Sequence, residues 1–473
     1  MKEQVDVFSQ GQSVTLDEVL ENREWRSYKQ NQLEDSYPED TVVAVKLNMP
    51  GAVKNSSQIQ QIFQAGWQVL LSDFDDLLIR KIILDKERKT GPEAFFIVKA
   101  SLVEVKKRAI SFEEQSFFGR LFDSDVMAKE DDAYQLSRTA LGFKPRTCLV
   151  CGENAKACAR DQRHDLADLH AVINSLYNQY FVDDSLLPVF SKEAVVKAAS
   201  FGFLAEAVTN PKPGLVDPVS VGAHDDMTIY TFVDSTLALQ DYFGQTFEAG
   251  QDFAGRDLKE LLATIRPFGL KAEEAMIKAT NGINTHKGAI FTAGILLAAY
   301  GYASRNKEIV ALSDVQVIVS QMGADLVEKE LAAKANAADE GALTAGQSQF
   351  HQYKLTGVRG EVQMGLRPLS EFGLKTLRES KGSDNDRLLD SLMAIAGGIE
   401  DSTLIKRAKT PAITKEMVEY VDTFRKLGGA STEEGKAYLS ELDEIFISRH
   451  LSIGGAADYL ILTALVGRLN GLI

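Results

Sequence analysis

Paired carboxylates mark residues 119–126 as a candidate site for chemistry on phosphates. Asp123 and Asp125 stand two residues apart in this stretch. On an extended chain alternate side chains project to the same side, so both carboxylates could coordinate one Mg²⁺ beside a phosphate. The spacing suits metal-assisted phosphoryl or nucleotidyl transfer, although an Asp-x-Asp pattern also occurs in solvated turns.

A second candidate site begins with a lysine in a stiff loop. Lys212 lies between Pro211 and Pro213, whose rings fix φ, and the following Gly214 permits a sharp turn. A lysine with so little backbone freedom is suited to binding a phosphate. Lys212 and Gly214 are therefore candidate substrate-binding residues.

Acidic residues and a histidine follow this loop. Asp217 comes first, and His224, Asp225 and Asp226 are consecutive a few positions later. Carboxylates at this density can hold a divalent metal ion, with the imidazole as a neighbouring donor or ligand. Any one of these aspartates could instead cap the N-terminus of a helix, and the spacing does not decide between the two roles.

Residues 282–288 immediately precede the longest uncharged apolar run of the chain, 288–304, which predicts a buried core helix. Asn284, His286 and Lys287 lie here between two glycines. Backbone N–H groups at the start of the helix, together with the lysine, would form an anion-binding cradle. The spacing differs from that of a Walker A loop.

Two later stretches carry charged residues whose role the spacing leaves open. Arg359 and Glu361 stand among glycines in a polar stretch with few helix signals, which predicts either an ordinary exposed loop or a loop that contacts substrate. Asp401 and Asp458 are interpreted as helix caps.

All three cysteines of the chain fall in one cluster, which is typical of cytosolic thiols and not of a disulfide framework. The cluster consists of Cys148, Cys151, Cys158 and His164. These groups could supply four tetrahedral Zn²⁺ ligands, but the spacing after the Cys-x-x-Cys step is not that of a standard zinc module. We therefore favour small buried thiols beside arginines that meet an anion. Arg160 and Arg163 would share a helix face and could both engage a triphosphate.

The elements that must position these groups change in character near residue 187. Before it, Val43, Val45, Leu47 and Met49 alternate with other residues, which predicts a half-buried strand. Runs 68–72, 94–99 and 103–112 have similar β-type composition. We therefore expect residues 1–186 to form an α+β domain with a mixed or antiparallel sheet.

Residues 187–473 are dominated by helical periodicity, and we expect an all-helical domain there. Predicted helices cover 194–208, 258–280, 288–305, 313–336, 386–399, 415–427 and 455–470.

Composition limits the possible partners. The 473 residues include 67 acidic and 52 basic side chains, a formal net charge of −15. Nucleic-acid binding depends on clustered Lys and Arg, so a general nucleic-acid binder is excluded. The N-terminal residues lack the layout of a signal peptide, and the apolar run is shorter than the roughly 20 residues that a bilayer needs. We expect a cytoplasmic enzyme that contacts neither nucleic acid nor membrane.

The motifs of the first domain resemble those of the citrate lyase holo-acyl-carrier synthase family, CitX, over about residues 1–182. The matching strings are Arg23-x-x-Arg26, residues 47–51 with Lys54-Asn55, residues 119–126 and the cysteine cluster. Members transfer a phosphoribosyl-dephospho-CoA group from its triphosphate precursor to a serine of the acyl-carrier subunit of citrate lyase, releasing diphosphate.

This resemblance implies a nucleotidyltransferase-type reaction in which Asp123 and Asp125 hold Mg²⁺ while the serine hydroxyl attacks the α-phosphate. The implied substrate-binding residues of this domain are Arg23, Arg26, Lys54, Arg120, Arg160 and Arg163. Zinc is not part of what the resemblance implies, so we do not expect a zinc cofactor.

Three strings of the second domain, 211–217, 222–227 and 284–288, are similar to those of the triphosphoribosyl-dephospho-CoA synthase family, CitG. The resemblance covers about residues 190–473. Members condense ATP with 3′-dephospho-CoA: the CoA ribose 2′-hydroxyl attacks C1′ of the ATP ribose, and adenine leaves. An all-helical fold and a Mg²⁺-dependent reaction are implied. Ile453 stands where relatives have proline, which leaves the Asp458 carboxylate in place.

The two resemblances together predict a bifunctional transferase that makes and installs the citrate lyase prosthetic group. For the glycosyl step, the candidates are Lys212 and Lys287 with Mg²⁺ for phosphate, Asp217, Asp225 and Asp226 for metal or base, His224 or His286 for adenine departure, and Gly214, Asn284, Arg359 and Glu361 for further substrate contacts. Two alternatives stay open. One is a zinc-stabilised, non-enzymatic scaffold that binds the carrier subunit; the other is the same chemistry on a malonate decarboxylase carrier.

Overall fold

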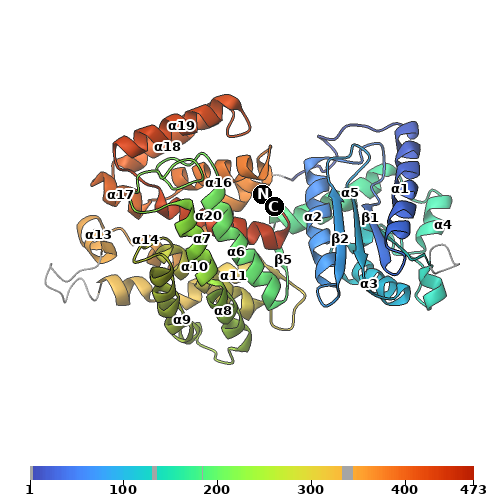
Figure 1. Ribbon diagram of the computed structural model, residues 1–473, viewed down its shortest axis with the longest axis horizontal. Coiled ribbons are helices and arrows are strands. Elements are labelled where there is room, and N and C mark those ends of the chain that lie inside the picture. Colours follow the sequence, from blue (N-terminus) through green and yellow to red (C-terminus); the bar gives the residue numbers. More distant parts are fainter. Residues whose placement is uncertain (1–3, 130–135, 184, 333–344) are drawn as a thin grey trace. The chain divides into compact units, whose positions relative to one another are not determined.

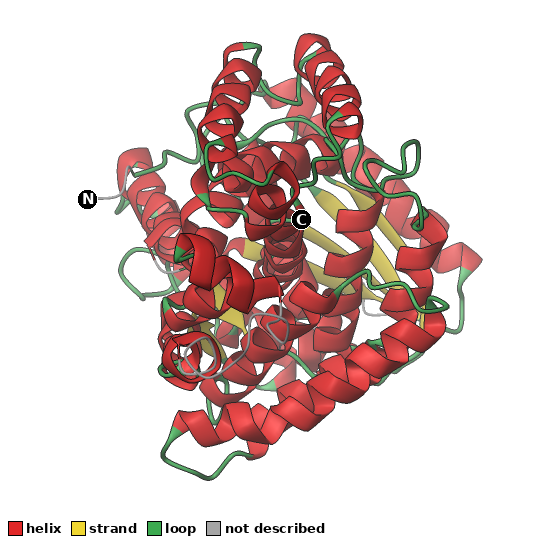
Figure 2. Ribbon diagram, turned by 90° about the vertical axis from the view of Figure 1, so that its left-hand side faces the viewer, coloured by secondary structure: helices red, strands yellow, loops and turns green. Residues whose placement is uncertain are grey.

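The structure, a computed structural model, describes residues 4–129, 136–183, 185–332 and 345–473. The chain divides into two compact units, of which the first spans Met1–Ser185 and the second Leu186–Gly471. Helices account for most of the described chain, and strands, yellow in Figure 2, account for a small part of it.

The first unit contains a four-stranded antiparallel sheet in the order β2-β3-β1-β4. Its strands are β1 (Thr41–Leu47), β2 (Ile79–Asp85), β3 (Glu93–Val98) and β4 (Phe122–Met127). Its helices are α1 (Leu16–Ser36), α2 (Ser57–Ser72), α3 (Leu102–Gln115), α4 (Ala155–Arg160) and α5 (Leu166–Tyr177), with short helical turns η1 (Gly119–Leu121), η2 (Arg138–Leu141) and η3 (Asn178–Asp183).

Different helices cover the two faces of this sheet, with α1 on one side and α2 on the other (Figure 1). The core of the α1 face consists of Leu33, Val42, Ala44, Phe95, Ile97 and Met127. On the opposite face, Phe63 of α2 and Phe112 of α3 pack against Phe122 of β4. Side chains alternate along a strand, so Asp123 and Asp125 lie on the α1 face.

The second unit is built mainly from helices. They are α6 (Lys192–Val208), α7 (Ile229–Ala238), α8 (Gln240–Asp252), α9 (Leu258–Ala279), α10 (Lys287–Ala303), α11 (Leu312–Met322), α13 (Ala345–Tyr353), α14 (Gly357–Gln363), α15 (Lys375–Glu379), α16 (Asp384–Gly398), α17 (Ser402–Ala408), α18 (Ile413–Lys426), α19 (Glu433–Ser448) and α20 (Gly454–Asn470). The π-helical turns η4 (Val327–Ala332) and η6 (Leu369–Leu374) and a short antiparallel pair, β5 (Leu186–Pro188) and β6 (Ile309–Ala311), complete it.

Helices α10 and α20 form the centre of the second unit and are buried along most of their length. Helix α10 packs closely on α8. Gly250 and Gly301 allow this approach, since a side chain at either position would collide with the backbone of the facing helix. The apolar run 288–304 is therefore a core helix, as predicted. No helix in the described ranges is both long and apolar enough to cross a membrane.

Most predicted elements are confirmed. The alternation beginning at Val43 belongs to β1, which is mostly buried and not half-buried as predicted, and residues 94–98 belong to β3. The predicted helices correspond to α6, α9, α10, α16, α18 and α20. The predicted helix 313–336 is α11, a turn at residues 323–325 and then η4, so it is interrupted, and residues 333–336 lie outside the described residues.

The β-type interpretation of residues 68–72 and 103–112 is wrong, because both stretches are helical. The Ser101 hydroxyl caps the N-terminus of α3, and the buried Leu102, Val105 and Ala109 recur at helical spacing. Their β-branched neighbours suggested a strand, but packing of this apolar face against the sheet decides the conformation.

The loop predicted around Arg359 is also wrong, since this stretch is helix α14. Its glycines suggested a loop, but Gly360 makes room for Thr356, whose side chain would collide with any Cβ there. The β5–β6 pair likewise corrects the expectation of a purely helical second domain.

Candidate active sites

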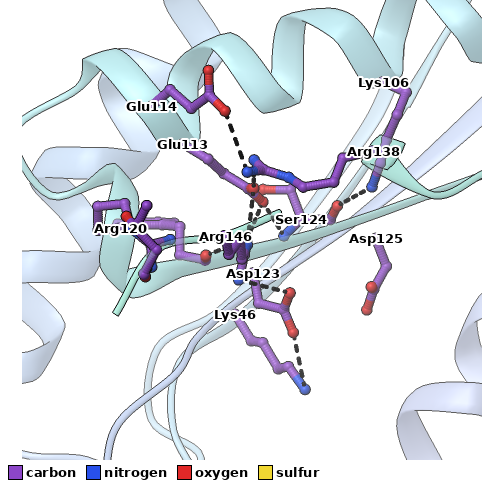
Figure 3. Close-up of polar contacts among 12 residues, drawn as sticks. Lys46, Lys106, Glu113, Glu114, Arg120, Asp123, Ser124, Asp125, Arg138 and Arg146 are labelled. Atoms are coloured by element: carbon purple, nitrogen blue, oxygen red, sulfur yellow. Dashed lines mark hydrogen bonds and ion pairs between the residues drawn. The ribbon is translucent and has the colours of Figure 1, made fainter. Parts of the chain in front are cut away.

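In the first unit, Asp123 and Asp125 of β4 lie beside several cations. Figure 3 shows Asp123 between Lys46 and Arg146, with Asp125 farther along the strand. Asp123 forms ion pairs with Lys46 at 3.6 Å and Arg146 at 3.4 Å, and Asp125 with Arg26 at 3.2 Å. The side chains of Asp123 and Asp125 remain 35% and 26% exposed. Two accessible carboxylates balanced by nearby cations form an arrangement that can hold a metal ion and phosphate oxygens.

Glu113 of α3 holds two arginines at this site, one of which pairs with Asp123. Its buried carboxylate pairs with Arg146 at 2.5 Å and with Arg138 at 3.1 Å. It also accepts the backbone N–H of Ser124 at 3.1 Å. Burial acts to lower the pKa of Arg146, but the hydrogen bonds to Glu113 raise it overall. Arg146 therefore stays charged beside Asp123, and Glu113 ties α3 to β4.

The other predicted cations of this unit occupy varied positions. Arg26 is buried and also pairs with Glu93, whereas Arg23 is exposed. The Lys54 ammonium group donates to the Met49 carbonyl at 2.5 Å. Burial, reinforced by Lys46 and Arg23, lowers the pKa of Lys54. Of these three predicted cations, Arg26 is the one that pairs with an aspartate of the site.

Arg120, Arg160 and Arg163 lie at the cysteine segment. Arg120 donates to the Thr147 carbonyl, and burial lowers its pKa. The side chains of Arg160 and Arg163 are 80% and 49% exposed, and both pair with Asp161. The structure does not bring these two arginines into the Asp123 network.

Sequence reasoning missed Lys46, Glu93, Glu113, Arg138 and Arg146 as site residues. Lys46 is the one charged residue of β1, and a charge in a largely apolar strand could have marked it as a candidate site residue. Its position directly opposite Asp123 follows from the β1–β4 register, which the sequence does not specify.

In the second unit, buried charged side chains stabilise the predicted loop around Lys212. Lys212 is fully buried, and its ammonium group pairs with the buried Glu206 at 2.5 Å. Asp217, also buried, accepts the backbone N–H groups of Lys212 at 3.1 Å and of Val219 and Ser220 at 2.8 Å. These three charged side chains therefore hold the loop in shape.

Gly214 and the residues around His224 complete this loop. The Gly214 N–H donates to Asp443 at 2.8 Å, and the positive φ of 66° at this residue favours glycine. His224 contacts Arg407 at 3.3 Å and Ser452 at 3.2 Å. Burial and the Arg407 charge lower the pKa of His224.

Asp225 and Asp226 are exposed next to this histidine. Within the described part of the chain, neither belongs to a group of three or more His, Cys, Asp or Glu side chains close enough to share a metal ion. A metal at these aspartates would therefore need further ligands from water or substrate.

The residues before α10 have separate surroundings. His286 is buried, its Nδ1 contacts Ser235 at 2.7 Å, and its Nε2 has no hydrogen-bond partner among the described residues. Burial and then the Lys212 charge lower the pKa of His286 to about 3, so this imidazole is neutral at physiological pH. Lys287 is exposed and pairs with Glu273 at 2.7 Å, while Asn284 accepts the Lys287 N–H at 3.2 Å.

A cavity of about 230 Å³ opens beside the start of α10, between α14, α17 and α20. Its acidic lining residues are Glu361, Glu400, Asp401 and Asp458, and none of the described lining residues is basic. Predicted Glu361 lines it and accepts the Tyr459 hydroxyl at 3.0 Å, whereas Arg359 pairs with Glu330 at 2.7 Å. Burial raises the pKa of Glu361.

Asp458 lies in surroundings that disfavour an ionised carboxylate. It retains partial access through the cavity, but surrounding protein and then the charges of Asp401 and Glu206 raise its pKa well above the usual range. The buried Asp401 accepts backbone N–H groups from α17 and from Ala456. Asp401 caps α17 as predicted, whereas Asp458 lies inside α20, so its interpretation as a cap is wrong.

One of the predicted motifs of this unit, residues 284–288, reaches the cavity. A side chain at Gly288 would collide with the Asp458 carboxylate, so the start of α10 touches the cavity directly. The charge of Glu206, which pairs with Lys212, contributes to the raised pKa of Asp458. Gly288 lines this acidic cavity, whereas the described lining includes no residue of the Lys212 loop. We take the cavity as the candidate active site.

Family comparisons agree with two transferase units. Residues 14–180 match the model CitX, described as apo-citrate lyase phosphoribosyl-dephospho-CoA transferase. Residues 192–472 match CitG, described as ATP:dephospho-CoA triphosphoribosyl transferase. The chain is thus a bifunctional transferase.

Relatives cover nearly the whole chain. Protein CitXG of Leuconostoc mesenteroides subsp. cremoris is 44% identical over 467 residues, 99% of this chain and 100% of the relative. Protein CitXG of Haemophilus influenzae is 32% identical over 464 residues, 96% of each chain. A probable 2-(5''-triphosphoribosyl)-3'-dephosphocoenzyme-A synthase of Lactiplantibacillus plantarum is 40% identical over 273 residues, 58% of this chain and 96% of the relative. The chain belongs to the CitXG family.

Proposed function

We propose that the second unit makes the citrate lyase prosthetic group and that the first unit attaches it to the acyl-carrier subunit. In the first reaction, ATP and 3′-dephospho-CoA give 2′-(5″-triphosphoribosyl)-3′-dephospho-CoA and adenine. In the second, a carrier serine takes the phosphoribosyl-dephospho-CoA group, and diphosphate leaves. The observation that carries the proposal is the match of both transferase families within one chain, each over a unit with its own charged site.

The acidic cavity suits the glycosyl step. Asp458, with its raised pKa, is the proposed acceptor of the 2′-hydroxyl proton. Glu361 and Glu400 would stabilise the positive charge that develops at C1′. Burial lowers the pKa of His286, which argues against a role as an imidazolium that protonates the departing adenine.

A triphosphate needs cations that the described cavity lining lacks. Carboxylate oxygens on the exposed Asp225 and Asp226 fit a largely hydrated Mg²⁺, which would neutralise phosphate charge when bound. Lys287, at the start of α10, is the proposed protein cation for the triphosphate. Lys212, Gly214 and Asp217 position the loop, and His224 links it to α17 through Arg407.

In the first unit, Asp123 and Asp125 fit a Mg²⁺ ion because they are accessible and lie on one face of β4. A bound Mg²⁺ would neutralise the phosphates of the substrate. Lys46 and Arg146 would stabilise the charge of the departing diphosphate, and Arg26 holds Asp125 in place.

The experiment is mass spectrometry of the apo carrier subunit of citrate lyase after incubation with the protein, ATP, Mg²⁺ and 3′-dephospho-CoA. We expect a mass gain equal to the phosphoribosyl-dephospho-CoA group. Adenine release without a gain would refute the attachment step, and absence of both would favour the non-enzymatic scaffold. A malonate decarboxylase carrier, tested in parallel, should stay unmodified. We further propose that the reactions occur in the cytoplasm, without nucleic acid.

A further inference from the structure

The cysteine segment of the first unit brings four potential metal ligands close together. The ligand atoms of Cys148, Cys151, Cys158 and His164 all lie within 4.8 Å of one another. Cys151 Sγ and Cys158 Sγ are 3.4 Å apart. Around a tetrahedral Zn²⁺ with Zn–S bonds of about 2.3 Å, sulfur atoms are about 3.8 Å apart. The observed cluster needs only small side-chain movements to reach that geometry.

The backbone shapes this cluster. Gly152 has a positive φ of 74° and donates its N–H to the Cys148 carbonyl at 3.0 Å, which closes a turn between the first two cysteines. Asn154 caps α4, which carries Cys158. The sequence spacing differed from standard zinc modules, but these local turns bring the ligands together.

His164 supplies a second, independent indication of a ligand. Its Nε2 is buried and has no hydrogen-bond partner among the described residues. A buried polar nitrogen is costly when it lacks a partner, and a metal ion would satisfy it. Cys151 is exposed and provides a route for the ion to enter, whereas Cys158 is buried.

We propose that Cys148, Cys151, Cys158 and His164 bind one structural Zn²⁺. Three thiolates and one neutral imidazole fill all four positions of a tetrahedral ion, so the site is closed and has no position for a substrate. Binding releases the thiol protons to solvent, with no redox change. The arrangement counts against the expectation that this protein does without zinc.

The ion would stabilise the segment that borders the aspartate site. Arg146, two residues before Cys148, pairs with Asp123 and Glu113, and the intervening Thr147 accepts a hydrogen bond from Arg120. A metal anchor at Cys148 restricts this segment in the same way that a disulfide would. Zinc thus acts on the transfer site as a positioning element, not as a catalyst.

The test begins with metal analysis of the full-length wild-type protein, purified without chelators from zinc-supplemented cells. We expect one Zn²⁺ per chain. Replacement by Co²⁺ should give the intense visible absorption of a tetrahedral thiolate site. Both measurements use the unmodified protein, so they do not depend on the folding of a variant or on either transferase activity.

Variants assign the ligands. C151S and H164A should lose most of the zinc, whereas H351A, which removes an exposed histidine of α13, should retain all of it. The proposal is overturned if the wild-type protein contains no stoichiometric zinc, if Cys151 and Cys158 are isolated as a disulfide in the native protein, or if both ligand variants keep the metal.

Discussion

The two candidate sites use carboxylates in opposite surroundings. Asp123 and Asp125 of the first unit are partly exposed, and each pairs with at least one cation. Asp401 and Asp458 of the second unit lie beside each other in a cavity whose described lining contains no basic residue. In the second arrangement, burial above all raises the pKa of both carboxylates.

This difference separates two chemical tasks. Accessible carboxylates among arginine and lysine side chains are suited to metal and phosphate binding. Crowded carboxylates with raised pKa are suited to moving protons and stabilising a developing positive charge. The phosphoryl step and the glycosyl step should therefore respond to different substitutions.

The largest expected effect is that of D458N. Loss of the proposed proton acceptor should slow adenine release by about 10²–10⁴-fold. Attachment to the carrier from supplied triphosphoribosyl-dephospho-CoA should continue at the wild-type rate. Steady-state assays of the two half-reactions measure this. D314N, which changes an exposed aspartate of α11, serves as the matched control and should leave both rates unchanged.

The stability of D458N separates catalysis from folding. A carboxyl group whose pKa is higher in the folded state contributes stability below its unfolded pKa, and that stability is lost as pH rises through its folded pKa. At pH 8 the asparagine variant should therefore unfold at no lower temperature than the wild type. A large drop in Tm would attribute the lost activity to misfolding and contradict the assignment.

D123N should give the reverse pattern, with a somewhat smaller effect. Removal of a carboxylate charge from the proposed metal site should slow carrier attachment by about 10²–10³-fold, while adenine release stays unchanged. The mass of the carrier and the released adenine, measured in the same reaction, report both steps. Loss of adenine release in this variant would show that the two tasks are not separable.

R146K tests the cation network around Asp123. Lysine keeps the charge but cannot bridge Glu113 and Asp123 with a planar fork. Loss of one charged hydrogen bond, worth about 1.5–3 kcal/mol, should slow attachment by roughly 10–100-fold. R80K, at an exposed position of β2, is the control and should behave as wild type. Equal effects of both substitutions would disprove a special role for Arg146.

The pH dependence of adenine release tests the raised pKa. If Asp458 must be ionised to accept a proton, kcat/KM falls as pH drops through its pKa. Because this pKa lies well above the usual range, the acid limb should occur above pH of about 4, the ordinary value for aspartate. A rate constant down to pH 4 would contradict proton transfer to Asp458.

The smallest effect is expected for K287Q. The exposed ion pair with Glu273 contributes at most about 1 kcal/mol, so Tm should change little. If Lys287 meets the triphosphate, KM for ATP should rise by up to about tenfold. K259Q removes a comparable exposed pair with Asp325 and should leave KM unchanged. Identical KM values in both variants would show that Lys287 does not contact the triphosphate.

Local sequence patterns predicted part of the first site. The Asp-x-Asp spacing placed Asp123 and Asp125 on one face because strand side chains alternate. Lys46 and Glu113 could not be assigned, since their positions depend on strand register and on packing of α3 against the sheet. Residues 103–112 were misread because tertiary packing overrode β-propensity.

Fewer residues of the second site could be predicted from the sequence. The motif around Lys212 suggested a cation directed at substrate, but Glu206 lies on the preceding helix and engages it inside the protein. Asp401 and Asp458 come from helices that are separated in sequence, and their meeting depends on long-range packing. An acidic residue in a largely apolar helix such as α20 is the sequence signal that could have found Asp458.

The most direct test of separate tasks mixes D458N and D123N with ATP, Mg²⁺, 3′-dephospho-CoA and the apo carrier. Each variant alone should leave the carrier unmodified in mass spectra, whereas the mixture should produce the phosphoribosyl-dephospho-CoA adduct, because each protein supplies the step that the other lacks. A mixture that gives no adduct, or D458N that modifies the carrier unaided, would contradict the account.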